Sequence, residues 1–149
     1  MSRDDRRGFT LLELLVVISV IAILAALVTP MVFRNVGDAK QSAAKAQLGI
    51  FELALDAYRL DNDYYPSTGQ GLGALVQRPT GNPAAANWRG PYLKRGIPAD
   101  PWGRPYLYQN PARPGAEGYD LKALGRDGVA GGAGEDADIS LADTTGRTR

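Results

Sequence analysis

The sequence predicts an α+β protein in which one long amino-terminal helix packs on a small antiparallel sheet. Three observations lead to this fold class. The run from Phe9 to Phe33 is almost wholly apolar, a pattern of helical spacing follows it, and most of the 18 glycines and 10 prolines come after Leu60. With 149 residues the chain is long enough for one compact domain beside a membrane segment, and we expect a single globular domain.

The first half of the long helix has the properties of a membrane segment. The stretch from Leu14 to Phe33 carries no charge, and as a helix it spans about 30 Å, the thickness of a bilayer's hydrocarbon core. Three arginines precede it, so we expect the amino terminus to stay in the cytoplasm and the rest to be exported. The alternative is a secretory signal peptide cut near Ala25 or Ala26, but such a peptide has no reason to carry a carboxylate like Glu13.

The second half of the helix is predicted to be amphipathic. From Val36 onward, apolar residues recur every three or four positions with charged residues between them. This apolar stripe consists of Val36, Ala39, Ala43, Ala46, Ile50, Leu53, Ala57 and Leu60. We expect one continuous helix from about Thr10 to Leu60, with most of the stripe packed on the chain's own domain, and a stop between Asp61 and Pro66.

Short elements joined by ordered loops are predicted for the rest of the chain. Gly71 to Gln77 is a candidate short helix, and Tyr106–Gln109 and Tyr119–Leu124 have the pattern of two antiparallel strands. The segments Trp88–Leu93 and Asp100–Pro105 combine Gly and Pro with aromatic residues and are predicted to be ordered loops.

Composition argues against most enzymes and against nucleic-acid binding. The chain has no His and no Cys, so the commonest general base, thiolate nucleophiles and the usual zinc ligands are absent. Its 17 basic and 16 acidic residues leave a net charge of +1, which creates no field that would gather an acidic polymer. We therefore predict no catalytic residues. No motif in the sequence supports the alternative of a lipid- or glycan-active enzyme that uses Asp and Glu pairs.

Two groups of motifs carry a family resemblance. Gly8-Phe9-Thr10-Leu11-Leu12-Glu13 resembles the processing site of type IV pilins and pseudopilins. Tyr65-Pro-Ser-Thr-Gly-Gln-Gly-Leu72, Gly90-Pro-Tyr-Leu93 and Pro98-Ala-Asp-Pro-Trp-Gly103 resemble the major pseudopilins of type II secretion systems. The resemblance runs from Gly8 to about Ser140 and implies a pilin-like fold. The lack of cysteine agrees with it, because many type IV pilins close a carboxy-terminal loop with a disulfide.

The resemblance implies how the amino-terminal segment is processed and used. A prepilin peptidase would remove residues 1–8 by cutting after Gly8 and would methylate Phe9, which leaves residues 9–33 as the transmembrane and filament-core helix and 34–149 as a periplasmic domain. Glu13 of one subunit would meet the amine of Phe9 on its neighbour; the alternative is a carboxylate that reaches the membrane interface. At Pro30 the family implies a melted segment, and a simple kink is the alternative.

The resemblance also implies a function without catalysis. The protein would be an inner-membrane, single-pass subunit of a helical periplasmic filament that drives protein export. Its expected partners are further copies of itself, minor pseudopilins, the prepilin peptidase, an inner-membrane assembly platform and an outer-membrane secretin. The alternative function is a type IV or competence pilin that serves adhesion, motility or DNA uptake.

An acidic, glycine-rich segment near the carboxy terminus is a candidate calcium site. Six acids stand against Lys122 and Arg126: Asp120, Asp127, Glu135, Asp136, Asp138 and Asp143. Hard oxygen donors on a flexible loop suit calcium; a solvated acidic loop and a single glycine-rich calcium β-helix repeat are the alternatives. The resemblance implies as ligands the carbonyls of Leu124 and Val129 and the side chains of Asp127, Asp138 and Ser140, with Asp136 as the alternative to Asp138.

Overall fold

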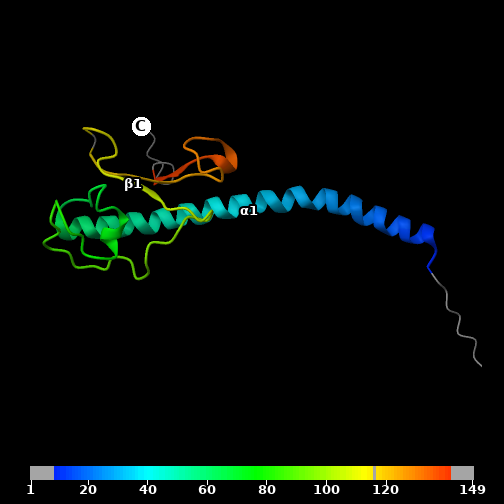
Figure 1. Ribbon diagram of the computed structural model, residues 1–149, viewed down its shortest axis with the longest axis horizontal. Coiled ribbons are helices and arrows are strands. Elements are labelled where there is room, and N and C mark those ends of the chain that lie inside the picture. Colours follow the sequence, from blue (N-terminus) through cyan, green and yellow to red (C-terminus); the bar gives the residue numbers. More distant parts are fainter. Residues whose placement is uncertain (1–8, 116, 142–149) are drawn as a thin grey trace, which may run out of the picture. The chain divides into compact units, whose positions relative to one another are not determined.

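The structure is a computed structural model that describes residues 9–115 and 117–141, without the side chains of residues 28–34. Its elements are the helix α1 (Leu11–Asn62), the short 3-10 helices η1 (Leu72–Leu75) and η2 (Gly134–Asp136), and the strands β1 (Leu107–Gln109), β2 (Asp120–Ala123) and β3 (Ile139–Ser140) (Figure 1). The chain divides after Gly37 into two compact units. A long helix with a small antiparallel sheet confirms the predicted α+β class.

Both ends of α1 are capped by side chains. The hydroxyl of Thr10 accepts a hydrogen bond of 3.2 Å from the amide of Glu13, which satisfies one of the free donors at the start of the helix. At the other end the Asn62 amide group donates to the carbonyl of Tyr58 at 3.0 Å, and Asp63 turns the chain with a φ of 68°. The helix predicted from about Thr10 to Leu60 is therefore confirmed to within two residues at each end.

The helix is continuous through Pro30, where the family resemblance implied a melted segment. The melted segment is not found in this structure, and the kink stays a prediction. Apolar side chains of the first unit are exposed along the helix, from Phe9 at 83% to Leu27 at 71%. Within the described part of the chain, no helix meets the length and hydropathy needed to cross a membrane.

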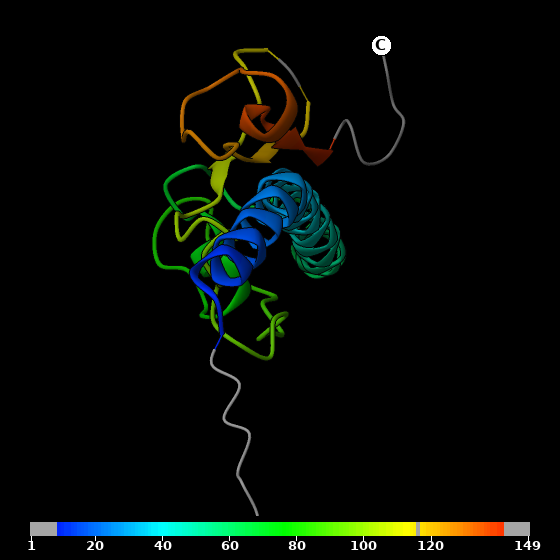
Figure 2. The same ribbon diagram turned by 90° about the vertical axis from the view of Figure 1, so that its right-hand side faces the viewer.

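The hydrophobic core of the second unit forms between α1 and the segments that follow it. Phe51 and Tyr58 are fully buried on α1, and the ring of Phe51 meets that of Tyr106 edge-on with centroids 5.0 Å apart. Leu75 of η1 and Leu121 of β2 complete the centre of this core. Figures 1 and 2 show the sheet and the loops beside this part of α1, and Figure 2, which looks along the helix, shows them on one side of it.

The three strands form one antiparallel sheet in the order β1-β2-β3. Tyr108 pairs with Leu121, and Ala123 pairs with Ile139. The two predicted strands are confirmed as β1 and β2, each shorter than predicted, and η1 lies within the predicted short helix. The sequence did not predict β3, because two residues are too few to show an alternating pattern.

The predicted packing of the apolar stripe of α1 is wrong. Leu53 is 73% exposed and Leu60 is 85% exposed, whereas Phe51 and Leu55 are fully buried. Two residues turn an α-helix by about 200°, so Leu53 points away from the face that carries Phe51 and Leu55. Both faces repeat every three or four residues. The domain covers the face with the aromatic rings, which bury more area, and leaves the stripe of alanines and aliphatic residues exposed.

Candidate functional site

The amino-terminal site is described from Phe9 onward. Gly8 lies outside the described residues, so the predicted cleavage between Gly8 and Phe9 is not tested. Phe9 is exposed, and Glu13 is an exposed residue in the first turn of α1. The Thr10-x-x-Glu13 spacing is that of a capping box, and the positive end of the helix dipole favours a carboxylate there. The sequence contained this signal; the structure shows the half of the box in which Thr10 accepts from the Glu13 amide.

Ion pairs neutralise much of the acidic loop, by which we mean residues 124–140. Arg126 lies 3.2 Å from the Glu135 carboxylate and 3.1 Å from that of Asp136, and Lys122 lies 3.7 Å from Asp138. These three acids are therefore compensated by cations of the chain itself. Of the other acids counted from the sequence, Asp143 lies outside the described residues.

The predicted calcium ligands lie in two parts of the acidic loop. Ser140 is in β3, and Asp138 and Leu124 flank the paired residues Ile139 and Ala123, so the pairing places Leu124, Asp138 and Ser140 near one end of β2 and β3. Asp127 and Val129 lie in the exposed turn, where the Asp127 carboxylate accepts a hydrogen bond of 3.0 Å from the Val129 amide. Among the residues placed by the structure, no cluster of three or more acidic, His or Cys side chains is suited to a metal. The predicted set thus combines two carboxylates with backbone and hydroxyl oxygens.

Arg104 is a residue of this site that the sequence analysis missed. Its guanidinium donates hydrogen bonds to the carbonyls of Leu124, at 3.2 Å, and of Gly125. The buried carboxylate of Asp100 holds the backbone beneath it, because it accepts from the amides of Trp102 at 2.9 Å and of Arg104 at 2.8 Å. The predicted ordered loop Asp100–Pro105 therefore places a cation against the acidic loop. Twenty residues separate Arg104 from Leu124, and no local motif signals such a contact.

Two glycines let the acidic loop close around Asp136. A Cβ atom on Gly125 or on Gly132 would collide with the backbone of Asp136, and Gly132 also has a φ of 84°, which L side chains rarely adopt. This close approach fixes the backbone of Asp136 inside the loop. Its carboxylate lies beside Arg126, which donates to both of its oxygens, at 3.1 and 3.5 Å.

The donor set fits calcium, and the fit is better for Asp138 than for Asp136. Oδ1 of Asp138 is buried and accepts no hydrogen bond from the described groups, whereas both oxygens of Asp136 are engaged by Arg126. A buried carboxylate oxygen without a donor is costly, and a bound cation would compensate it. Carboxylate, carbonyl and hydroxyl oxygens are also the donors that calcium prefers.

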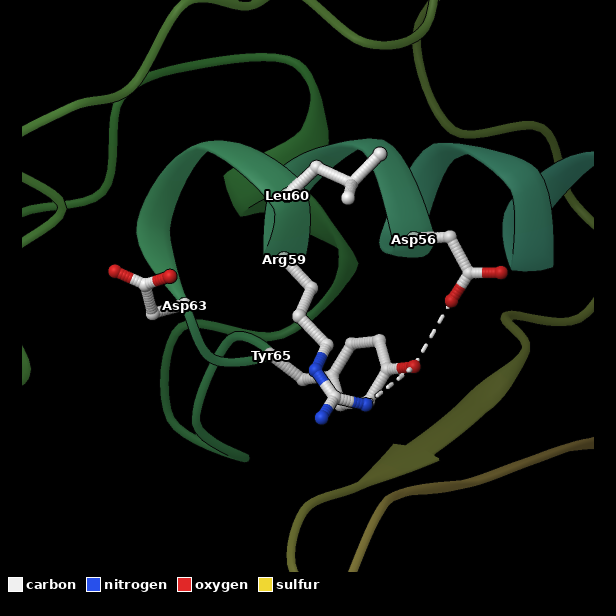
Figure 3. A pocket seen from close by; sticks show the side chains of 5 residues that line it. All are labelled: Asp56, Arg59, Leu60, Asp63 and Tyr65. Atoms are coloured by element: carbon white, nitrogen blue, oxygen red, sulfur yellow. Dashed lines mark hydrogen bonds between the residues drawn. The ribbon is translucent and has the colours of Figure 1, made fainter.

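A surface hollow lies at the carboxy-terminal end of α1. It is lined by Asp56, Arg59, Leu60, Asp63 and Tyr65 (Figure 3). The Tyr65 hydroxyl donates to Asp56 at 2.9 Å, and the Arg59 guanidinium lies 5.0 Å from the centre of the Tyr65 ring. Burial raises the pKa of Tyr65 above its ordinary value, so the hydroxyl stays protonated at neutral pH. These contacts join the loop after α1 to the helix.

Comparisons with known proteins agree on one family. Residues 31–142 match the model for "Type II secretion system (T2SS), protein G", and residues 3–29 match the prokaryotic N-terminal methylation motif. Type II secretion system core protein G of Pseudomonas aeruginosa is 50% identical, covering 93% of this chain and 96% of its own length. The same protein of Escherichia coli K12 is 49% identical, with 86% and 87% covered. The crystal structure of the major pseudopilin from the type 2 secretion system of enterohaemorrhagic E. coli has a TM-score of 0.60, is 41% identical, and covers 72% of this chain and 90% of its own.

Proposed function

Because this chain belongs to the type II secretion system protein G family, it is a structural subunit of that secretion system, and we propose that its copies stack into the periplasmic filament that drives protein export. The family matches support this function and not the alternative of a type IV or competence pilin. Family membership also favours a structural role over catalysis. That the chain performs no reaction stays a prediction.

The exposed apolar surface of α1 is the observation that best supports stacking. Leu53 and Leu60 are 73% and 85% exposed, on the face that the chain's own domain leaves uncovered. The first unit exposes a further series of apolar side chains between Phe9 and Leu27. Exposed apolar area on this scale favours association, because removing it from water contributes about 25 cal/mol per Å². Further copies of the same chain would cover both regions in a helical filament.

We place the subunit in the inner membrane as a single-pass protein with its domain in the periplasm. The match to the methylation motif supports removal of residues 1–8 by a prepilin peptidase. Membership of the secretion system supports assembly with its other components. The specific partners we propose are the minor pseudopilins, the inner-membrane assembly platform and the outer-membrane secretin.

Deleting the gene tests this function directly. We expect exoproteins to disappear from the culture supernatant and to return when the full gene is supplied in trans. Normal secretion in the deletion strain, together with a loss of surface filaments, would favour the pilin alternative.

Processing gives the second prediction. Intact-mass analysis of the membrane-extracted protein is expected to show a chain that begins at Phe9 and carries one methyl group on its amine. A variant with Gly8→Ala should remain at full length, because the glycine is the residue before the cut. A mature chain that begins after Ala25 or Ala26 would contradict the retained helix.

Replacing Glu13 separates its two roles. We expect Glu13→Ala to leave membrane insertion and cleavage intact and to weaken subunit stacking, measured as a loss of the higher bands in cross-linking ladders. The pairing of a carboxylate with an amine is stronger in a low-dielectric setting than in water. Glu13→Gln is the matched control, because Gln also completes a capping box but carries no charge. Normal ladders with Gln and short ladders with Ala would assign Glu13 to helix capping alone.

We also propose that the acidic loop binds one calcium ion. Leu124, Asp127, Val129, Asp138 and Ser140 would hold it, with Asp138 in place of Asp136. The ion would supply positive charge to the buried oxygen of Asp138 and would join the turn at Asp127 to the sheet. In a domain without disulfides, such a link restrains a glycine-rich loop.

A further inference from the structure

Two cations already contact the oxygens that calcium is predicted to use. Nζ of Lys122 lies 3.7 Å from Oδ2 of Asp138, and the Arg104 guanidinium donates to the carbonyl of Leu124 at 3.2 Å. Both come from outside the acidic loop: Lys122 from β2 and Arg104 from the loop before β1. Lys122 also pairs in register with Ser140, a third predicted ligand.

The two contacts are held in place by the fold. The side chains of Lys122 and Arg104 are each about 30% exposed, at 29% and 31%, so both charges are partly removed from water. Arg104 is fixed from below by Asp100 and lies against Gly128, where a Cβ atom would collide with its guanidinium. The loop is thus shaped to admit this side chain. A partly buried charge interacts with its neighbours more strongly than one in bulk water.

We propose that Lys122 and Arg104 are built-in counter-cations of the calcium loop, which hold its oxygens when calcium is absent and weaken calcium binding when it is present. This inference rests on the proposed calcium site. Lys122 pairs with Oδ2 of Asp138 without the ion, and it repels a divalent cation that approaches the same carboxylate. Arg104 likewise donates to the carbonyl of Leu124 when the ion is absent, and it competes with the ion for that oxygen. The two cations therefore keep the loop closed at low calcium and lower its affinity for calcium.

The two roles predict that removing either cation lowers the stability of the calcium-free chain and raises its affinity for calcium. For Lys122→Gln and Arg104→Gln in the full chain purified in detergent, we expect a lower melting temperature in chelator. We also expect a lower Kd for calcium in titration calorimetry. The loss of one positive charge close to a divalent ion gives an estimated change in Kd of roughly three- to tenfold at moderate salt. A residue that only supported the loop would lower the melting temperature and raise the Kd.

Two variants complete the test. Arg113→Gln removes the same charge from an exposed position between β1 and β2, and should change neither measurement appreciably. Arg126→Gln frees Asp136 and should leave the Kd nearer to the original than Lys122→Gln does. A larger gain in affinity with Arg126→Gln would make Asp136 the ligand and would overturn the role of Lys122. If the original chain binds calcium and Lys122→Gln has an unchanged or raised Kd, this inference alone is refuted. If neither the original chain nor any variant binds calcium, the calcium site itself is refuted.

Discussion

Replacing Leu53 by Asp is expected to stop filament assembly and secretion while the domain stays folded. Leu53 is 73% exposed in the single chain, so a carboxylate there remains in water and should change the free energy of unfolding by no more than about 0.5 kcal/mol. In a filament that covers the exposed stripe, the same carboxylate would be buried without a partner, at a cost of about several kcal/mol for each subunit. Cross-linking ladders and exoprotein levels measure assembly, and a melting curve measures the fold.

Leu107→Asp is the matched control for this prediction. Leu107 lies on β1 and is 42% exposed, so the same substitution adds the same charge away from the stripe. We expect it to assemble. Phe51→Ala, in contrast, removes a fully buried ring and should destabilise the domain by about 3–5 kcal/mol. If Leu53→Asp formed normal ladders and secreted normally, the stripe would not be a subunit interface.

The sequence predicted where the helix and the strands lie better than which face of the helix is buried. The apolar run and the helical spacing predicted α1 almost to its ends, because both signals are local and long. Periodicity could not decide between the face with Leu53 and the face with Phe51, since both repeat every three or four residues. That choice is made by tertiary packing, in which the rings of Phe51 and Tyr106 meet. The strand β3 was missed because its pairing with β2 is set by distant contacts.

For the candidate calcium site, the sequence named ligands but not the residues that surround them. Asp127 and Asp138 stand in a short glycine-rich segment, where family resemblance can be read directly. The pairing of Asp136 with Arg126 depends on how the loop closes around Gly125 and Gly132, which no local pattern reveals. Arg104 reaches the loop from another part of the chain. The fold, and not a local pattern, thus brings in the cations that compensate these acids.

Removing calcium is expected to lower the melting temperature of the chain by roughly 10 °C without unfolding it at room temperature. An ion that binds only the folded state contributes about 2.7 kcal/mol when its concentration is a hundred times its Kd. For a domain of about 110 residues this corresponds to roughly 10–12 °C. The loss should not be larger, because Lys122 and Arg126 still pair with Asp138, Glu135 and Asp136 in the absence of the ion. The difference is measured by two melting curves of the detergent-purified chain, one in chelator and one in millimolar calcium.

Three substitutions assign this effect to named oxygens. Asp127→Ala and Asp138→Asn should abolish the difference between the two melting curves, whereas Asp136→Asn should retain it, because that carboxylate is engaged by Arg126. The comparison within each variant matters, since Asp138→Asn also breaks the ion pair with Lys122 and lowers stability in chelator. Magnesium should restore little, because it demands a tighter octahedral geometry than a flexible loop provides. Identical curves in chelator and calcium for the original chain would leave the loop as a surface held by its ion pairs alone.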